Sequence, residues 1–245
     1  MVQENQDWQP ALKKTLLRWE VHLTDQLMEF FEVYLDELVQ WNSKVNLTAL
    51  KEPLHIALGH FADSLSPMTI DDVFKSRHIR AIDIGTGAGF PGLPLKIVNP
   101  DWQVSLVEST GKKCAFLRAI VAAMELDGVE IFNERCEELG YQKEHREKYD
   151  LAFARALSSL STLIEYGLPF LKVGGLLIAH RGRTAADEAT RVNVALEELG
   201  GEVKEIRHYE IAGLGGSRNL VVIQKVKPTS KHYPRRTGVA AKRPL

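Results

Sequence analysis

A glycine-rich segment is the part of the sequence whose residue types and spacing most clearly indicate chemistry. It follows a short apolar run that predicts a β-strand, and it reads Ile82-Asp83-Ile84-Gly85-Thr86-Gly87-Ala88-Gly89-Phe90-Pro91-Gly92. Glycine is needed where a chain turns sharply and lies close to a ligand, because a Cβ atom would occupy that space. A strand, this turn and a following helix predict a loop whose backbone holds a nucleotide-like ligand.

Two ligands fit this spacing. The series Gly87-x-Gly89-x-x-Gly92 matches a dinucleotide fingerprint. The series Asp83-x-Gly85-x-Gly87-x-Gly89 matches an S-adenosylmethionine site, in which the acid at the strand end can face the ammonium group of the cofactor. The dinucleotide spacing would prolong the strand through Gly85, a poor strand former, and would leave Asp83 near a diphosphate. S-adenosylmethionine is therefore the predicted cofactor, and a nicotinamide-dependent oxidoreductase is the alternative.

A second acid supports a nucleoside ligand. Glu108 follows the apolar run 104–107, where the carboxylate at the end of a strand can accept hydrogen bonds from both ribose hydroxyls. Dinucleotide sites use the same device, so Glu108 does not choose between the two ligands. Residues 133–137 come after the third predicted strand, where a loop would cover an adenine ring. A solvated loop with a small buried cysteine fits that segment equally well.

Arg155 stands where an acceptor would meet the donor methyl group, after the fourth predicted strand. The sequence has no Asn/Asp-Pro-Pro-aromatic element for an exocyclic amine and no Pro-Cys pair for attack on a pyrimidine carbon. A guanidinium cannot act as a base, but it can bind a purine edge, a phosphate or a carboxylate. An acceptor that already has a lone pair, such as N7 of guanine, needs only positioning and electrostatics. A structural ion pair is the other interpretation of Arg155.

Short apolar runs that alternate with helix-length segments predict the scaffold for these residues. The predicted helices cover 92–98, 112–126, 158–171 and 185–199, with Gly174-Gly175 as a helix stop. After them, 203–211 and 220–226 predict an antiparallel hairpin around a glycine-rich turn. The sum is an α/β fold with a doubly wound, Rossmann-like sheet of seven strands. Its first five predicted strands are Arg80–Ile84, Gln103–Val107, Val129–Phe132, Tyr149–Phe153 and Leu176–Ala179.

The remaining parts of the chain flank this sheet. An apolar stripe at helical spacing runs from Leu23 to Val39 and ends at Asn42, so residues 1–65 are predicted to form an N-terminal helical cap. Residues 66–227 form the predicted catalytic domain. The segment from Lys225 to the C-terminus has seven basic residues and no acidic one. The tail, 228–245, is therefore either a solubilising terminus or a phosphate-binding arm.

Composition excludes several classes of protein. The 245 residues include 31 basic and 32 acidic ones, for a net charge of -1, and 44% are hydrophobic, which excludes a disordered chain, a collagen and a coiled coil. Cys114 and Cys136 form no C-x-x-C pair, and no segment resembles a secretory signal or a bilayer span. We expect a cytoplasmic protein without a bound metal.

Several short motifs, in order along nearly the whole chain, resemble those of one family. It is the bacterial small-subunit ribosomal RNA guanine-N7 methyltransferases, also called glucose-inhibited division protein B. The segments that carry the resemblance are Trp41-Asn42, Asn46-Leu47-Thr48-Ala49, His60, Asp63-Ser64-Leu65, 83–95, Glu108-Ser109, Lys112-Lys113, Phe116-Leu117, Arg135-Cys136-Glu137, Arg155-Ala156, Leu168-Pro169, Lys172, 218–223, 233–236, Gly238, Lys242 and Pro244.

The resemblance implies a class I S-adenosylmethionine-dependent methyltransferase. It implies methyl transfer to N7 of a guanine in the decoding-region loop of 16S ribosomal RNA, in the cytoplasm. The partner would be 16S ribosomal RNA or the small ribosomal subunit, and we expect a monomer without an obligate protein partner. A non-catalytic RNA-binding module is a further alternative, because the basic tail and the lack of an obvious general base would also suit it.

The resemblance also assigns residues. Family cofactor contacts carry over to Gly85, Phe90, Cys136, Glu137 and Arg155, although the family commonly has alanine where Cys136 stands. His60 could touch substrate, but we favour a helix-capping role for it, and we expect Asp63-Ser64 to form a helix cap or turn anchor. The expected phosphate contacts are Lys112, Lys113, Arg181, Arg218, Arg235 and Arg236.

Overall fold

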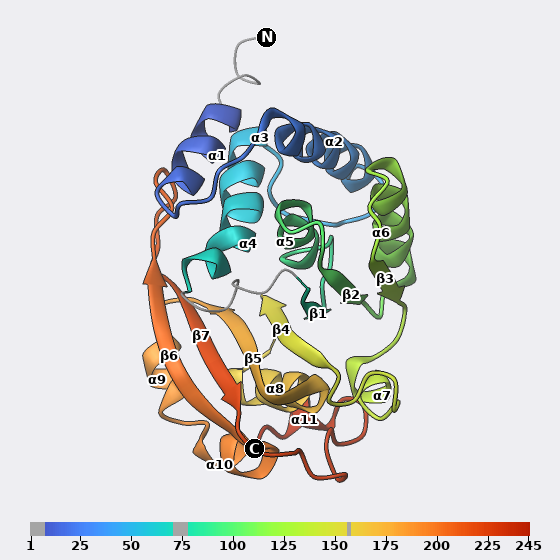
Figure 1. The fold of residues 1–245 in the computed structure, drawn as a ribbon, viewed down its shortest axis with the longest axis vertical. Helices are drawn as coiled ribbons and strands as arrows, with labels where there is room; N and C mark the ends of the chain where they lie inside the picture. Colours follow the sequence, from blue (N-terminus) through green and yellow to red (C-terminus); the bar gives the residue numbers. More distant parts are fainter. Residues whose placement is uncertain (1–7, 71–77, 156–157) are drawn as a thin grey trace.

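The computed structural model describes residues 8–70, 78–155 and 158–245. A seven-stranded sheet in the order β3-β2-β1-β4-β5-β7-β6 lies at its centre (Figure 1). Strands β1 to β5 are parallel, and β7 runs antiparallel to both β5 and β6. The predicted α/β fold is confirmed, with strand bounds β1 Arg80–Ile84, β2 Gln103–Val107, β3 Val129–Phe132, β4 Tyr149–Arg155, β5 Leu171–Arg181, β6 Gly201–Tyr209 and β7 Arg218–Lys225.

Helices cover both faces of this sheet because its strands are apolar on both sides. In β1, Ala81 packs into one core and its neighbour Ile82 into the other. This is the period-two alternation of a strand buried on both faces. The first face carries α5 (Gly92–Val98) and α6 (Gly111–Ala123), and the second carries α8 (Leu160–Gly167), α9 (Ala185–Ala189) and α10 (Asn193–Leu199).

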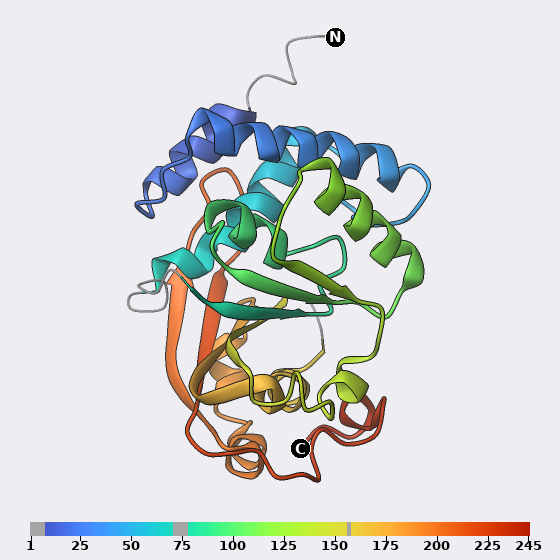
Figure 2. The same ribbon diagram turned by 45° about the vertical axis from the view of Figure 1, so that its right-hand side comes forward.

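The N-terminal helices form a further layer over α5 and α6 (Figure 2). Residues of α1 and α2 share one hydrophobic core with those two helices. Thr24 caps α2 by accepting a hydrogen bond from the Leu27 N–H at 3.2 Å. The predicted boundary at residue 65 falls inside a continuous helical run. The elements of this layer are α1 Trp8–Leu17, α2 Asp25–Asn42, α3 Pro53–Ile56, the π-helical η1 Ala57–Ala62, α4 Asp63–Leu65 and the 3-10 helix η2 Ser66–Thr69.

Two predicted helix boundaries are wrong. Gly174 and Gly175 do not stop a helix, because they lie inside β5, where Gly174 has a φ of 91° and interrupts the regular ladder. Helix α8 ends instead at Gly167 and is followed by the 3-10 turn η3 (Leu168–Phe170). The predicted helix 185–199 is two helices, α9 and α10. Glycine pairs signal both helix ends and strand irregularities, so the pattern alone could not separate them.

The basic tail folds back along the body of the protein. It runs beside α7 (Cys136–Leu139) and α8, and it ends in the short helix α11 (Val239–Lys242). The Thr162 hydroxyl donates to the Ala240 carbonyl at 3.2 Å, and Ala240 is fully buried. The tail is therefore part of the packed structure.

Among the residues that the structure describes, no helix is long and apolar enough to cross a membrane. In the same residues, no three His, Cys, Asp or Glu side chains gather in a way that could hold a metal ion.

Candidate active site

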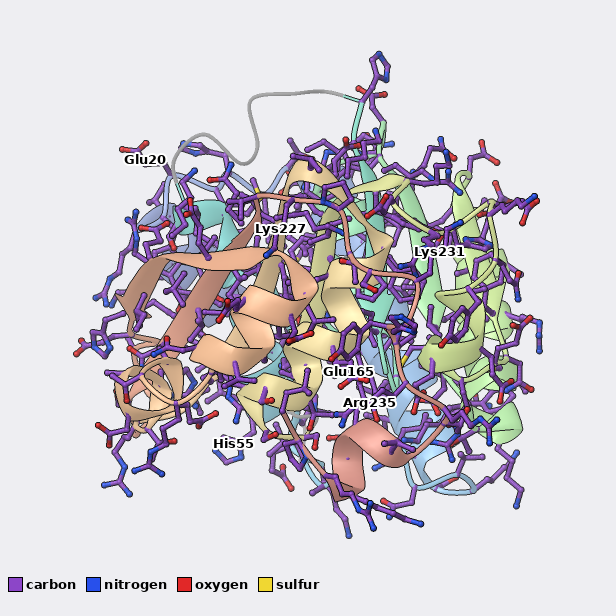
Figure 3. The ribbon with its side chains drawn as sticks, turned by 90° about the horizontal axis from the view of Figure 1, so that it is seen from below. Glu20, His55, Glu165, Lys227, Lys231 and Arg235 are labelled. Atoms are coloured by element: carbon purple, nitrogen blue, oxygen red, sulfur yellow. The ribbon has the colours of Figure 1, made fainter. Side chains whose placement is uncertain are left out.

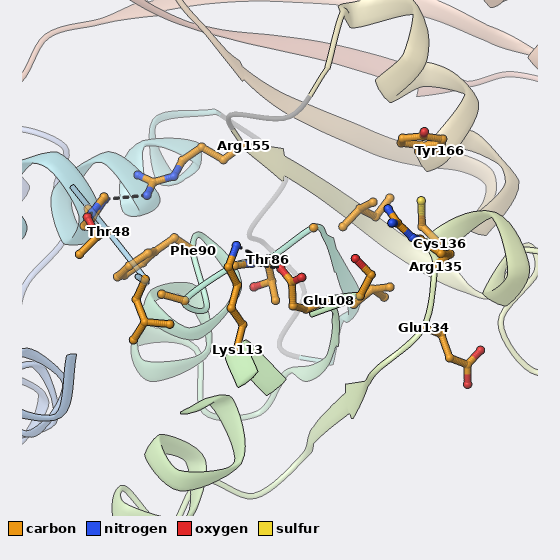
Figure 4. Close-up of a pocket in the computed structure, with 18 of the residues that line it drawn as sticks. Thr48, Thr86, Phe90, Glu108, Lys113, Glu134, Arg135, Cys136, Arg155 and Tyr166 are labelled. Atoms are coloured by element: carbon orange, nitrogen blue, oxygen red, sulfur yellow. Dashed lines mark hydrogen bonds and ion pairs between the residues drawn. The ribbon is translucent and has the colours of Figure 1, made fainter. Parts of the chain in front are cut away.

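A cavity of about 490 Å³ opens at the carboxyl ends of β1, β2 and β4. This is the edge at which open parallel sheets bind ligands, and the volume lies within the roughly 300–1,000 Å³ that is usual for small-molecule sites. Arg155 and Thr48 lie at one end, while Tyr166, Cys136 and Arg135 lie at the other (Figure 4). Glu108 and Lys113 lie between the two ends.

Asp83 supports the glycine loop from beneath and does not line this cavity. Its side chain is fully buried, and its Oδ2 accepts from the Thr86 hydroxyl at 2.5 Å and the Gly92 N–H at 2.8 Å. Burial raises the pKa of Asp83 to about 6. The structure therefore places Asp83 beneath the loop, where its carboxylate organises the turn that follows β1, and not on the cavity wall where the sequence had placed it.

The glycines of the loop have different roles. Gly85 and Gly87 line the cavity with φ angles of 66° and 62°, a region that favours glycine. Gly89 and Gly92 do not line it. A Cβ on Gly89 would collide with the Tyr34 hydroxyl, and one on Gly92 would lie 2.6 Å from Leu106 Cδ2. Gly89, predicted to bind cofactor, is therefore a packing position, as is the last glycine of the dinucleotide spacing.

Glu108 lies at the end of β2 and joins the loops that follow β1 and β2. Its Oε2 accepts from the Gly87 N–H at 3.1 Å, and its Oε1 accepts from the Thr110 N–H at 2.7 Å. Lys113 Nζ lies 4.0 Å from Oε2. The carboxylate lines the cavity, and these contacts hold it in place at the cavity wall.

The opposite wall of the cavity includes α7, the two residues before it and one residue of α8. Cys136, Glu137 and Tyr166 line it. The Glu137 side chain is buried and accepts from the Gly238 N–H at 2.9 Å and from Cys136 Sγ at 3.3 Å. Burial and the charge of Glu137 raise the pKa of the Cys136 thiol, which stays protonated. The segment predicted to cover an adenine ring therefore lies at the cavity.

Arg155 is fixed at the other end by three groups of the cap. One guanidinium nitrogen donates to Asp63 Oδ2 at 2.8 Å and to the Gly59 carbonyl at 3.1 Å. The other contacts His60 Nδ1 at 2.7 Å. The guanidinium carbon also lies 5.1 Å from the ring centroid of Phe90. Arg155 forms the structural ion pair of one interpretation, and it also lines the cavity, as a substrate-binding role would require.

His60 lines the cavity and is not a helix cap, contrary to the role we favoured. A guanidinium only donates, so Nδ1 must accept, and Nε2–H donates to the Thr48 hydroxyl at 2.6 Å. Burial and the charge of Arg155 lower the pKa of His60 to about 3. His60 is therefore neutral and stacks on Phe90 at 4.6 Å.

The Asp63 backbone lies at the C-cap of η1, whereas its side chain makes no capping bond and connects three distant parts of the chain. Its Oδ1 accepts from the Tyr209 hydroxyl at 2.8 Å and lies 3.3 Å from Arg218 Nε. Burial opposes its ionisation, but the charges of His180 and Arg155 and the bond from Tyr209 hold the pKa of Asp63 below its ordinary value. The cap is thus bound to β4 and β7 through one ionised carboxylate.

A second cavity of about 320 Å³ shares Arg155 with the first. Arg181, Arg218 and the buried His180 also line it. Two buried polar atoms there, His180 Nδ1 and Arg181 Nε, have no hydrogen-bond partner among the residues that the structure describes. Arg155 therefore stands between two cavities, and the second one is lined by three arginines and one acid, Asp63, which leaves an excess of positive charge.

The six predicted phosphate contacts lie in different environments. Lys112 is exposed, and Lys113 lines the first cavity. Arg181 pairs with Glu188, and Arg218 donates to the Gly215 carbonyl at 2.9 Å. The two tail residues, Arg235 and Arg236, differ from each other in exposure.

Arg235 is not a free cation at the surface, because it is already paired within the protein. Its guanidinium is bound to both carboxylate oxygens of Glu165, whose side chain is 1% exposed. Arg236, the next residue, is exposed. A glutamate this deeply buried needs a cationic partner, so Arg235 serves the fold.

Sequence reasoning from the residues missed two parts of the cavity. Tyr166 gave no signal, because a single aromatic residue in an apolar helix is typical of a core position. Thr48 entered only through the family motif, and its bond to His60 spans 12 positions.

Comparisons with known proteins agree with this geometry. The profile of the family described as rRNA small subunit methyltransferase G (GidB) matches residues 27–221. A ribosomal RNA small subunit methyltransferase G from Roseiflexus castenholzii is 46% identical over 228 residues, which is 93% of this chain and 95% of that protein. One of the same name from Desulforamulus reducens is 40% identical over 235 residues, 96% of this chain and 97% of that protein.

The fold is similar to that of a solved methyltransferase. A mutant 16S rRNA (adenine(1408)-N(1))-methyltransferase with cosubstrate SAM, from Catenulisporales acidiphilia, matches with a TM-score of 0.52 and 14% identity, covering 62% of this chain and 87% of that one. That likeness concerns the sheet and its helices. From the profile match and the identity over nearly its whole length, the chain belongs to the rRNA small subunit methyltransferase G family.

Proposed function

We propose that this chain transfers a methyl group from S-adenosylmethionine to N7 of a guanine in the decoding-region loop of 16S ribosomal RNA. The observation that carries the proposal is the position of Arg155. It lines both the cavity formed by the glycine loop and the second, cationic cavity. A donor site and an acceptor site must meet at one point, and Arg155 marks that point.

The residues of the first cavity fit S-adenosylmethionine. Glu108 offers the carboxylate that a ribose diol requires, and Gly87 leaves the backbone bare, since an added Cβ would meet nothing closer than 4.0 Å. Gly85, Cys136 and Glu137 would complete the site. When bound there, the cofactor supplies an electrophilic methyl group.

The second cavity suits the RNA. Arg181 and Arg218 lie on its wall, with Arg155 beside them. Arginines with fixed guanidinium planes bind phosphate in a bidentate manner. The acceptor nucleotide would be held there by its phosphate, with its base beside Arg155. Lys112 and Arg236 are exposed cations that can contact more distant phosphates.

No general base is required for this reaction. N7 of guanine carries no proton, so transfer needs a fixed acceptor and a suitable field. Two groups on the cavity wall that could act as bases already accept hydrogen bonds. Glu108 accepts from two backbone N–H groups, and His60 Nδ1 accepts from Arg155. Arg155 would contribute by orienting the purine edge.

The oxidoreductase alternative has less support. Two of the three glycines in the dinucleotide spacing, Gly89 and Gly92, are packing positions outside the cavity. A non-catalytic RNA-binding module would have the same cavities as an enzyme and would differ only in turnover. A methyl-transfer assay therefore has to distinguish the two.

The test is transfer of labelled methyl from S-adenosylmethionine to small ribosomal subunits from cells that lack this modification, followed by nucleoside mass spectrometry. We expect 7-methylguanosine at one site. Cofactor binding without any transfer, to naked RNA or to subunits, would favour the non-catalytic module. Absence of S-adenosylmethionine binding would refute the proposal and revive the dinucleotide alternative.

A further inference from the structure

The basic tail binds acidic groups of its own chain. Arg235 donates to Glu165 through Nε at 3.0 Å and Nη2 at 2.6 Å, and its backbone N–H donates to Glu165 at 2.7 Å. Figure 3 shows the two side chains together on the lower face of the molecule. Glu165 directly precedes Tyr166, which lines the cofactor cavity. The tail is thus anchored one residue from that cavity.

The tail also holds α7 directly. The Gly238 N–H donates to Glu137 Oε1 at 2.9 Å, and the Thr237 hydroxyl donates to Glu138 Oε1 at 3.1 Å. The Tyr141 hydroxyl, just beyond α7, donates to the Pro234 carbonyl. Helix α7 has four residues, too few to be stable without tertiary contacts. The tail supplies several of those contacts.

Arg146 fixes the path by which the tail reaches α7. Its guanidinium donates to the carbonyls of Tyr233 at 2.8 Å, Thr229 at 2.9 Å and Ser230 at 3.0 Å. The same side chain donates to the Gly140 carbonyl at 3.1 Å, at the end of α7. One residue therefore connects the start of the tail to the end of the helix.

We infer that residues 228–245 are a strap that positions the α7 wall of the cofactor cavity, and that Arg235 and Gly238 are positioning residues for S-adenosylmethionine binding. The inference rests on the proposed function for its ligand. The Glu137 side chain bonds to the tail, so its orientation and that of Cys136 beside it depend on the strap. A substitution that loosens the tail should therefore weaken cofactor binding, although it replaces no residue that lines the cavity.

The test compares Arg235→Ala with the matched control Arg236→Ala. The two variants remove the same charge from neighbouring tail positions, but only the first breaks the bond to Glu165. In the absence of RNA, we expect the Kd for S-adenosylmethionine, measured by titration calorimetry, to rise roughly fivefold to tenfold in Arg235→Ala, an ordinary coupling between sites. It should stay unchanged in Arg236→Ala.

Hydrogen exchange of the ligand-free protein gives a readout that does not depend on the cofactor. Amides of residues 136–141 should exchange faster in Arg235→Ala than in the wild type or in Arg236→Ala. Thr237→Val alters only an exposed hydroxyl that contacts Glu138, so folding is not at risk, and it should speed exchange in the same segment. If Arg235→Ala does not fold, Thr237→Val decides the question.

Equal loss of RNA affinity in both arginine variants, with unchanged cofactor Kd and unchanged exchange, would overturn the strap and make the tail an RNA arm. The two proposals fail separately. If the wild type does not bind S-adenosylmethionine, the proposed function fails, whereas unchanged exchange in Arg235→Ala and Thr237→Val refutes the strap alone.

Discussion

The two ends of the cofactor cavity are held by different kinds of interaction. At one end, Arg155 is bound by the Asp63 carboxylate, the His60 imidazole and the Gly59 carbonyl, all from the helical cap. At the other end, Glu137 is bound by one backbone N–H from the tail. At the first end the charge network itself lines the cavity, whereas at the second end Glu137 is held by hydrogen bonds and the buried ion pair of the tail, Arg235 with Glu165, lies outside the cavity wall.

This difference indicates how each end can respond to change. A buried charge that loses its partner is costly, so the Arg155 end is stable only as a complete set. A hydrogen bond to a charged group is worth roughly 1.5–3 kcal/mol, so the contact between Gly238 and Glu137 can open at a lower cost than the Arg155 network, provided that Arg235 stays on Glu165. A rigid end suits the orientation of an acceptor, and a looser end suits entry and exit of a cofactor.

Asp63→Ala should have the largest effect, because it leaves Arg155 and Arg218 without their shared carboxylate. We expect a loss of about 3–5 kcal/mol in the free energy of unfolding, measured with denaturant. Asp25→Ala is the control, because its partner Lys13 and Asp25 itself are exposed, and it should change little. A small effect of Asp63→Ala would show that the two ends are equally tolerant.

Arg155→Ala should lower the single-turnover rate of methyl transfer about 10²- to 10³-fold, as expected for loss of a fixed electrostatic group. Its Kd for S-adenosylmethionine should change less than that of Arg235→Ala. Arg155→Lys should recover little, because an ammonium cannot bind three partners in a plane. Unchanged turnover would reduce Arg155 to a structural ion pair and remove the contrast between the two ends.

The ionisation of Asp83, beneath the glycine loop, should make the free energy of unfolding depend on pH. Its folded-state pKa of about 6 lies above its ordinary value of 3.8, so the protonated form favours folding. This stabilisation is complete below about pH 4 and is lost as the pH rises through about 6. Relative to Asp83→Asn, which cannot ionise, the wild type should lose about 3 kcal/mol between those limits. Unfolding curves from pH 4 to 7 measure this difference.

The charge of Arg155 lowers the pKa of Asp83. The titration of Asp83 therefore depends on the Arg155 end of the cavity. In Arg155→Ala the pH at which stability falls should move upward. In Arg235→Ala it should stay where it is. A shift in both variants would contradict independent ends.

His60 should give the smallest effect. His60→Ala removes a neutral acceptor from Arg155 and should slow transfer roughly 3- to 10-fold, the value of one such hydrogen bond. His60→Asn keeps an oxygen that can accept from Arg155 and should be closer to the wild type. Equal rates in the two variants would mean that stacking on Phe90 matters more than the bond. Rate measurements at saturating cofactor distinguish these outcomes.

The sheet could be predicted because its signals are local. Strands β1, β2 and β3 begin and end where the apolar runs do, since strands covered by helices on both faces are continuous apolar segments. The glycine loop and Glu108 were found for the same reason, because each directly follows one of these strands.

Contacts between residues far apart in the sequence could not be predicted in this way. Arg155 is 92 positions from Asp63, and Glu137 is 101 positions from Gly238. No periodicity links such pairs, so Asp63 resembled a helix cap and Arg235 resembled an RNA contact. Asp83 also misled, because the end of a strand fixes where a carboxylate starts but not whether it turns toward the ligand or beneath the loop.

The central place of Asp63 limits how this enzyme could be redesigned. Its three partners come from β4, β6 and β7, since Arg155 ends the first, Tyr209 ends the second and Arg218 begins the third. A chimera that exchanged the helical cap for that of another methyltransferase would separate the carboxylate from all three. Grafting new acceptor specificity onto this scaffold therefore requires the helical run from Pro53 to Thr69 to be transferred together with the strand ends it binds.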